Sequence, residues 1–310
     1  MKNIANDDLV AEVKYRINNL DIDSLLSAGE LEQLITDTNF LGLPKILVTE
    51  RPDTAVKSIL QGKVIVIING SPYALVMPAV MIDFLSTPED TNLKTMFGNF
   101  LKRIRLIAAF FALLLPGLYV AITSFHREII PTELLYSILS SRQSVPFPII
   151  FEILIMEISF EIIREAGLRV PSPIGPTLGI VGAIVLGQAA VSAGIVSPIL
   201  IIIVAITGIS SFAIPDFTFS FHLRYFRFAF LLLGYIAGFI GIGIGAFIYI
   251  SSMCDLKTFG VSYTAPYAPI TDSKGNGFFL SPIWKREYRN SYLSAKREKN
   301  QDKISMKWRF

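Results

Sequence analysis

"LIAAFFALLLPGLYVAITSF", residues 106–125, is a run of twenty residues that carries no charged side chain. A helix of about 20 apolar residues is long enough to cross the roughly 30 Å hydrocarbon core of a bilayer. Lys102, Arg103 and Arg105 precede the run, and basic residues of this kind mark the cytoplasmic end of a membrane helix. The stretch predicts a transmembrane helix, kinked at Pro116, in an integral membrane protein surrounded by lipid.

The composition of the whole chain agrees with a membrane protein. Of its 310 residues, 52% are hydrophobic and 17% are charged, whereas soluble domains are about 25% charged. Residues 1–100 hold 8 Lys/Arg and 13 Asp/Glu, a net charge of −5, and residues 101–310 hold 20 and 12, a net charge of +8. This asymmetry predicts an acidic soluble module followed by a membrane part with basic flanks.

The part before the first apolar run has the pattern of a small α/β domain. Helical spacing over 24–35 predicts one helix. The stretch "TAVKSILQ" predicts a second helix, with Asp53 before it as the N-cap and Gly62 just past its C-terminal end. Asn69-Gly70 between two β-rich arms predicts a hairpin. Because "MKNIANDDLVAEVKY" contains no signal-peptide core, we expect this domain in the cytoplasm, and its abrupt start predicts the end of a longer domain.

Further apolar runs follow the first one. A mixed stretch at 126–147 predicts a short amphipathic helix at a membrane face. The membrane-length runs after it are 148–168, 177–196, 197–214 and 228–252. The expected fold is a small cytoplasmic α/β domain at 1–100, a polytopic α-helical membrane domain with four to five membrane segments at 101–253, and a polar, basic C-terminal tail at 254–310. We expect the part 285–310 of this tail to be mobile and cytoplasmic.

The number of runs conflicts with the charge distribution. Basic residues before 106–125 and in the tail both favour the cytoplasmic side, which requires an even number of crossings, whereas five runs are present. The run 148–168 is the first candidate for a re-entrant or interfacial segment, because it alone carries acids along its length. If it does not cross, however, the predicted loop with Arg224 and Arg227 lies outside, against the same rule.

Four glycines in the run 228–252 are predicted to pack helices together. Gly234, Gly238, Gly241 and Gly245 are spaced at i, i+4, i+7 and i+11, which forms one stripe on a continuous helix. Small residues in such a stripe let another helix approach closely. The letters "GIGIG" in this run have no strand before them, so we do not interpret them as a phosphate-binding loop.

The run 177–196 is rich in small residues and permits two interpretations. Glycine costs about 1 kcal/mol relative to alanine in a helix, so close helix packing offsets that cost, or the small side chains leave a lumen. In the second case the run lines a narrow pore or substrate path, with Gln188 and Ser192 as polar contacts. The candidate pore-lining residues are Gly179, Gly182, Gly187, Gln188 and Ser192.

An acidic row is the unusual feature of the run 148–168. Glu157, Glu161 and Glu165 recur every four residues and lie within about 80° of one another around a helix. Arginines three residues after Glu161 and four after Glu165 are within reach of in-helix ion pairs. Unpaired charges at mid-bilayer cost several kcal/mol. The acids are therefore exposed at an interface, paired with arginines there or elsewhere in the chain, or placed to attract cations or couple a signal to gating.

Several function classes do not fit the sequence. It has no Ser/His/Asp order, no metal-ligand spacing and no nucleophile elbow. His126 and His222 have no partners at a recognisable spacing, and Cys254 is the single cysteine. We therefore expect no enzyme activity, no metal or other cofactor, no disulfide within the chain and no nucleic-acid partner.

Several segments resemble a known protein family. The block "EISFEIIREAGLRVPSPIGPTLGIVGAIVLGQAAVSAGIVSP" (157–198) is long and specific, and shorter matches are "TERPD" (49–53), "STPED" (86–90), "IPTEL" (130–134), "VPFP" (145–148) and "FGVSYTAPYAP" (259–269). From about residue 20 to 285 the chain is similar to the spore germination protein GerA family, the A subunits of nutrient germinant receptors. Members are usually longer at the N-terminus, so this chain resembles an N-terminally short member.

The resemblance implies a function. The family's A subunits lie in the spore inner membrane with a permease-like B subunit and a lipoprotein C subunit, and assemble as a homo-oligomeric ring that forms a nutrient-gated cation channel. We therefore expect this chain to trigger spore germination as such a subunit. The alternatives are a small-solute carrier, which predicts broken helices in two matching halves, and a membrane-anchored scaffold of the receptor complex.

Overall fold

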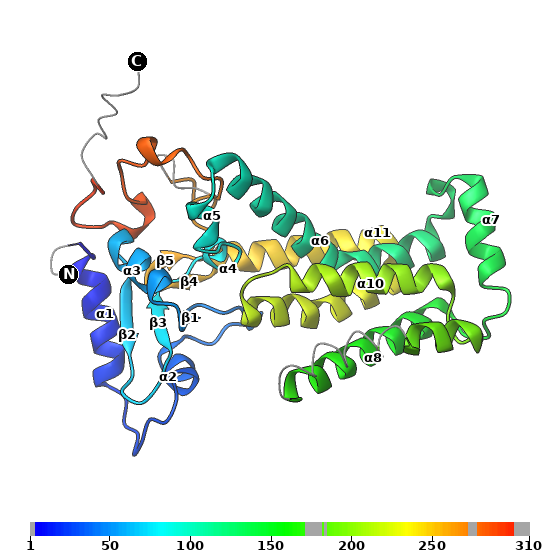
Figure 1. Ribbon diagram of the computed structural model, residues 1–310, viewed down its shortest axis with the longest axis horizontal. Coiled ribbons are helices and arrows are strands. Elements are labelled where there is room, and N and C mark those ends of the chain that lie inside the picture. Colours follow the sequence, from blue (N-terminus) through cyan, green and yellow to red (C-terminus); the bar gives the residue numbers. More distant parts are fainter. Residues whose placement is uncertain (1–3, 171–181, 183–184, 272–277, 301–310) are drawn as a thin grey trace. The chain divides into compact units, whose positions relative to one another are not determined.

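The computed structural model describes residues 4–170, 182, 185–271 and 278–300. Helices predominate, and a small sheet lies within the first hundred residues (Figure 1). The chain divides into two compact units. Unit 1 comprises Met1–Leu106, Ile214–Phe219 and Ile248–Phe310, and unit 2 comprises Ile107–Ala213 and Ser220–Phe247.

Unit 1 is built on a three-stranded antiparallel sheet in the order β1–β3–β2. The strands are β1 (Leu47–Thr49), β2 (Val64–Ile67) and β3 (Ala74–Met77). Strands β2 and β3 pair from Val64 opposite Met77 to Ile67 opposite Ala74, so the predicted hairpin is present, with residues 68–73 as its loop. Gly70 in this loop has a φ of +84°, which glycine adopts without strain.

Three helices contact this sheet, namely α1 (Asp7–Asn18), α2 (Ala28–Ile35) and α3 (Pro52–Gln61). The short helices α4 (Met81–Phe84) and α5 (Glu89–Asn92) follow β3 along the chain. Leu9 of α1, Leu31 of α2 and Leu75 of β3 belong to one buried apolar cluster. The proline at the start of α3 has a fixed φ that suits the first helical position, so the N-cap is Arg51 and not the predicted Asp53.

The segment after residue 255 contains short strands and 3-10 helices. It contains β4 (Lys257–Thr258), β5 (Val261–Ser262), η2 (Ile283–Lys285) and η3 (Ser291–Leu293), and its described part belongs to unit 1. Phe259 joins the core cluster of α1 and α2. Arg289 Nε donates to the carbonyl oxygen of Leu60 at 2.6 Å. Buried apolar side chains and main-chain acceptors hold the described part of this segment, and the mobility expected for 285–310 stays a prediction.

The remaining elements are long helices and the short pieces that connect them. They are α6 (Thr95–Phe125), η1 (Arg127–Ile129), α7 (Thr132–Ser141), α8 (Ile149–Arg169), α10 (Pro198–Phe212) and α11 (Phe217–Asp255). Residues 185–192 are also helical. Within the described ranges, α6 and α11 are long and apolar enough to cross a membrane, and α10 is a shorter apolar helix. The predicted run 106–125 therefore lies within one helix, with Pro116 inside it.

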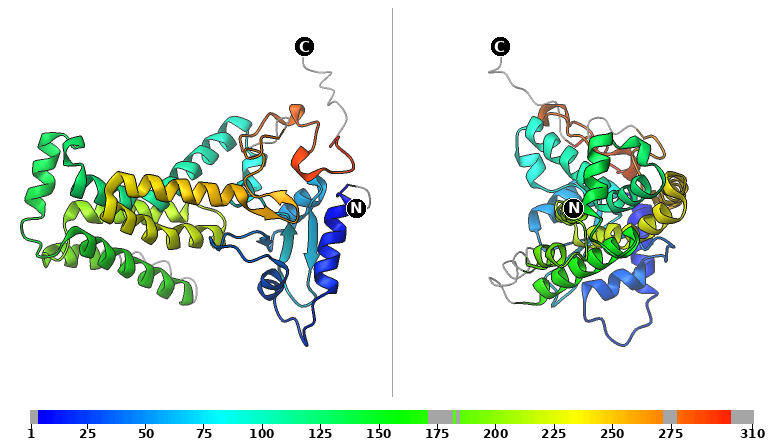
Figure 2. Two further views of the ribbon diagram at one scale, coloured as in Figure 1. Left: turned by 180° about the vertical axis from the view of Figure 1, so that it is seen from behind. Right: turned by 90° about the vertical axis from the view of Figure 1, so that its right-hand side faces the viewer.

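Helix α11 is broken near its middle. Ala237 has φ −133° and ψ 15°, and Gly238 has φ +57° and ψ −138°, a combination that only glycine adopts readily. In a straight helix, residues twelve apart are separated by about 18 Å. A Cβ added at Gly245 would nevertheless lie 2.5 Å from Leu233 Cδ1. The second half therefore turns back alongside the first (Figure 2).

The break corrects the interpretation of 228–252 as one straight run with one glycine stripe. Gly241 and Gly245 face the first half of α11, because a Cβ at Gly241 would lie 2.3 Å from the Leu233 carbonyl oxygen. Because α11 doubles back, the stretches before and after Ser220–Phe247 both belong to unit 1. The run 228–252 therefore belongs to two helical halves that lie side by side, and the number of membrane crossings stays a prediction.

Gly234 lies where α11 approaches α6 most closely. A Cβ added at Gly234 would lie 2.5 Å from the Gly117 carbonyl oxygen, and one added at Gly117 would lie 2.7 Å from the Phe230 carbonyl oxygen. Only small residues permit two helix backbones to approach this closely. The core of unit 2 continues from here through α8 and α10, with Ile153 and Leu200 fully buried.

Candidate functional site

The acids of α8 lead to a buried group of charges in unit 2. Glu157 and Arg227 of α11 each have side chains that are 1% exposed, and Arg227 NH2 lies 3.0 Å from Glu157 Oε2. The same NH2 donates to Glu161 Oε1 at 2.9 Å, and Arg224 NH1 donates to Glu161 Oε2 at 2.6 Å. Two carboxylates from α8 thus meet two guanidinium groups from α11.

Arg164 extends this group to α10. Its NH2 donates to Ser211 Oγ at 2.7 Å and to the Gly208 carbonyl oxygen at 3.3 Å. Its guanidinium carbon lies 4.1 Å from the centroid of the Phe212 ring, a distance at which a cation is attracted to the aromatic face. Its NH1 is 4.0 Å from Glu161 Oε1. The group therefore links α8, α10 and α11.

We name these five residues the Glu–Arg cluster: Glu157, Glu161, Arg164, Arg224 and Arg227. Charges buried in an apolar unit persist when they are paired, and removing one partner of such a pair typically costs about 3–5 kcal/mol. With every member ionised, three arginines outweigh two carboxylates by one positive charge. The five side chains then carry a net charge of +1.

Glu152, which lies off the acidic row, is also buried. Arg142 NH2 donates to its Oε1 at 2.7 Å, and the backbone N–H of Ser197 donates to its Oε2 at 3.2 Å. Ser197 is the N-cap of α10. A carboxylate at this position compensates the partial positive charge at the start of that helix.

The acidic row thus divides into a buried and an exposed part. Glu157 and Glu161 pair with arginines from elsewhere in the chain, which is one of the alternatives that the sequence left open. Glu165 has a side chain that is 60% exposed and forms an i,i+4 bridge with Arg169 at 2.7 Å. A role of the row in attracting cations or coupling a signal to gating stays a prediction.

Sequence reasoning missed the partners of these acids because it placed Arg224 and Arg227 in a loop. The structure starts α11 at Phe217, and the side chain of its N-cap Asp216 accepts from Phe219 N at 2.7 Å. An aspartate before an apolar run is a helix-start signal, and residues three apart share a helix face. Together these two signals would have placed both arginines on one face.

The candidate pore-lining residues do not all face the same way. On the helix at 185–192, Gln188 and Ser192 are exposed, and Ser192 Oγ donates to the Gln188 carbonyl oxygen at 2.8 Å. Gly187 is buried, and a Cβ added there would lie 3.7 Å from Ile201 of α10. The residues therefore separate into an exposed polar pair and a packing contact.

Two further glycines of this set need separate mention. A Cβ added at Gly182 would lie 3.7 Å from Ile163 of α8, so this glycine packs against that helix. Gly179 lies outside the described residues. Pore lining stays a prediction for the whole set.

The histidines lie beside aromatic rings in unit 2. The centroid of the His126 ring is 4.5 Å from that of Phe239, and the His222 centroid is 4.6 Å from that of Phe226. Within the described part of the chain, no group of three or more His, Cys, Asp or Glu side chains is placed to hold a metal ion.

Comparisons with known proteins point to one family. Residues 1–292 match the family described as "Bacillus/Clostridium GerA spore germination protein". Spore germination protein KA of Bacillus subtilis (strain 168) is 41% identical over 305 residues, which cover 98% of this chain and 56% of that protein. Spore germination protein GerLA of Bacillus cereus is 40% identical over 269 residues, which cover 87% of this chain and 55% of that protein.

The matches extend over most of this chain but over a smaller part of its relatives. The chain spans about half the length of the curated relatives it matches, 55% to 56% of the two named above. No solved structure matches the chain. Because the family match covers nearly every residue that carries the sheet, the long helices and the Glu–Arg cluster, this chain belongs to the Bacillus/Clostridium GerA family of spore germination proteins.

Proposed function

We propose that this chain is an A-type subunit of a nutrient germinant receptor, and that copies of it form a ring that conducts monovalent cations across the spore inner membrane. Its relatives are spore germination proteins by name, which supports a role in germination. A permease-like B subunit and a lipoprotein C subunit are the proposed partners. In this arrangement residues 1–100 face the cytoplasm.

The observation that carries the conduction proposal is the exposed Gln188. It lies in an apolar run with Ser192 on the same exposed face of a helix. Transfer of a side-chain amide into hydrocarbon without hydrogen bonds costs about 2–7 kcal/mol of free energy. Contact of this face with water or with a neighbouring subunit would avoid that cost. In a ring of subunits around a water-filled path, this face has both water and a neighbouring subunit beside it.

The Glu–Arg cluster has a second role in this proposal. It connects α8, which precedes the small-residue run, to α10 and to the first half of α11. Packed elements that share buried ion pairs have discrete arrangements and do not deform continuously. We assign to the cluster the task of transmitting a displacement between these helices when the receptor responds to a germinant.

The experiment is substitution of Gln188 in spores whose receptor is supplied by this chain and its partners. Gln188→Trp fills the proposed path and should reduce germinant-triggered release of monovalent cations strongly at an unchanged receptor level. The matched control is Ile202→Trp, because Ile202 is also exposed, on α10, but is apolar. We expect cation release in that variant to match the wild type.

Each other outcome rejects a defined part of the proposal. Wild-type cation release by Gln188→Trp at equal receptor abundance would reject pore lining by this helix. Saturable uptake of a labelled solute without cation flux in proteoliposomes would identify a carrier. Binding to the B and C subunits without any flux would identify a scaffold.

A further inference from the structure

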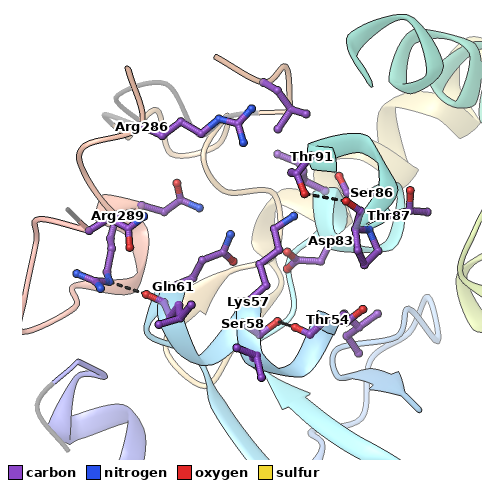
Figure 3. A pocket seen from close by; sticks show the side chains of 18 of the residues that line it. Thr54, Lys57, Ser58, Gln61, Asp83, Ser86, Thr87, Thr91, Arg286 and Arg289 are labelled. Atoms are coloured by element: carbon purple, nitrogen blue, oxygen red, sulfur yellow. Dashed lines mark hydrogen bonds between the residues drawn. The ribbon is translucent and has the colours of Figure 1, made fainter. Parts of the chain in front are cut away.

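A pocket of about 490 Å³ lies within unit 1, beside helix α3 (Figure 3). Its walls come from α3, from residues 82–91 and from residues 286–300. Cavities of about 300–1,000 Å³ are the size that proteins use for small molecules. The proposed conduction of ions by unit 2 makes no use of this pocket.

Cationic side chains gather around the pocket. They are Lys57, Lys102, Arg286 and Arg289. Arg289 is buried and donates to the carbonyl oxygens of Leu60 at 2.6 Å and Arg297 at 2.8 Å. Lys102 Nζ donates to the Phe278 carbonyl oxygen at 2.8 Å. These acceptors are neutral, so they leave the positive charges of Arg289 and Lys102 in place.

The carboxylates in the lining do not cancel those charges. Asp83 Oδ2 lies 2.5 Å from Lys63 Nζ, and Asp53 Oδ2 lies 2.9 Å from Arg51 NH2, so each acid is paired with another cation. Across the described ranges, no carboxylate forms an ion pair with Lys57. Among the described residues that line the pocket, four cationic side chains therefore face two carboxylates.

Lys57 extends into the pocket from α3, and Arg286 extends into it from the opposite wall (Figure 3). Burial lowers the pKa of the Lys57 ammonium group, and the nearby positive charge of Arg286 lowers it further. An anion between the two side chains would favour the charged form of the lysine and reduce their mutual repulsion.

Two polar atoms in the lining have unused hydrogen-bonding capacity. Ser86 Oγ and Asn290 Oδ1 are buried and have no hydrogen-bond partner among the residues that the structure describes. Buried polar groups are nearly always hydrogen-bonded, so each unsatisfied one calls for an explanation. A hydroxyl group can donate to an oxyanion, and an amide oxygen can accept from a hydroxyl or amine on the same ligand.

We infer that unit 1 carries a binding site for a small organic anion, whose phosphate or carboxylate group is held by Lys57, Arg286 and Arg289. Ser86 and Asn290 bind the polar remainder of the molecule. Charge-assisted hydrogen bonds from lysine and arginine are the strong contacts by which proteins hold such groups. The site is separate from the Glu–Arg cluster, and its test does not depend on ion conduction.

The test is isothermal titration calorimetry on the full chain in lipid nanodiscs. Inorganic phosphate, acetate and citrate are titrated separately, and sodium chloride at the same ionic strength provides the blank. We expect saturable binding of at least one of them at one site per chain. The phosphate and carboxylate arms then identify which acidic group the site prefers. Lys57→Gln should weaken binding about tenfold or more, since charged hydrogen bonds are the strongest of the proposed contacts.

Two further variants keep the inference falsifiable. Ser86→Ala should weaken binding less than Lys57→Gln does, and it supplies the test if Lys57→Gln does not fold. Lys14→Gln removes an equal charge from an exposed position on α1 and should bind like the wild type. The inference fails if no probe binds saturably, or if Lys14→Gln loses as much affinity as Lys57→Gln.

Discussion

Arg227 contacts both carboxylates of the Glu–Arg cluster. Its side chain is 1% exposed, and its NH2 lies 3.0 Å from Glu157 Oε2 and 2.9 Å from Glu161 Oε1. We expect Arg227→Ala to lower the free energy of unfolding by about 3–5 kcal/mol, because it leaves a buried carboxylate unpaired. Chemical denaturation of the purified protein in detergent micelles measures this loss.

The exposed bridge of the same helix supplies the control. Arg169→Ala removes an ion pair with Glu165 whose members are 79% and 60% exposed, and such pairs contribute about 0–1 kcal/mol. Replacing Glu157 and Arg227 together by leucine should recover most of the loss, since no unpaired charge remains at that position. Equal effects of Arg227→Ala and Arg169→Ala would show that the cluster does not stabilise unit 2.

Glu32 gives unit 1 a predicted pH dependence. Burial raises the pKa of its carboxyl group from 4.5 to about 7, with a contribution from the negative charge of Asp216. The fold therefore favours the protonated acid, and this contribution to stability is fully present below about pH 4.5 and is lost as the pH rises through 7. Glu32→Gln should raise the melting temperature relative to the wild type at pH 8 and much less at pH 5. A pH-independent difference would contradict the assignment.

At the scale of single elements, the break in α11 is directly testable. Leu233→Cys and Gly245→Cys, introduced together in a Cys254→Ser background, should form a disulfide on mild oxidation, because the Leu233 side chain reaches the position of a Gly245 Cβ. In a straight helix the two positions would be about 18 Å apart. Electrophoretic mobility before and after reduction detects the bond.

The matched pair lies in α6. Phe97→Cys and Ala109→Cys are also twelve residues apart, inside one uninterrupted helix, and should remain reduced under the same conditions. Cross-linking in α6 to the same extent as in α11 would indicate unspecific oxidation. A failure of the α11 pair to cross-link would contradict the reversal of α11.

The elements differ in how far the sequence predicted them. The hairpin around Gly70 and the helix over 106–125 follow from local signals, namely a turn dipeptide and an unbroken apolar run, and both are present. The position of the break at Gly238 does not follow from the sequence, because Gly234, Gly241 and Gly245 of the same apolar run stay helical. The two halves contact each other through residues such as Leu233 and Gly245, and such contacts cannot be read from periodicity.

For the molecule as a whole, the sequence predicted the class of protein better than its division into units. Charge and hydropathy separated an acidic front part from an apolar remainder, and α6 and α11 are long enough to cross a membrane. Charge and hydropathy did not predict that the residues after 254 belong to the same unit as the first hundred residues. Phe259, for example, is part of the core of unit 1. The aromatic and main-chain contacts that hold this segment leave no mark in its basic composition.

The candidate site shows the same limit. The four-residue spacing of Glu157, Glu161 and Glu165 predicted a row on one helix face. Their environments differ, because Glu157 and Glu161 contact Arg227 of α11 whereas Glu165 is exposed. Their partners lie more than sixty residues further along the chain. The spacing identifies the face, and the neighbouring helix decides which acids are buried.

Cation flux into proteoliposomes that contain this chain with the proposed B and C subunits tests the proposed function most directly. We predict that the germinant opens a flux of potassium ions, that Gln188→Trp reduces this flux about tenfold or more by filling the proposed path, and that Ile202→Trp leaves it unchanged. A complex that binds its germinant but shows no germinant-dependent flux would contradict the proposal that this subunit forms the conducting path.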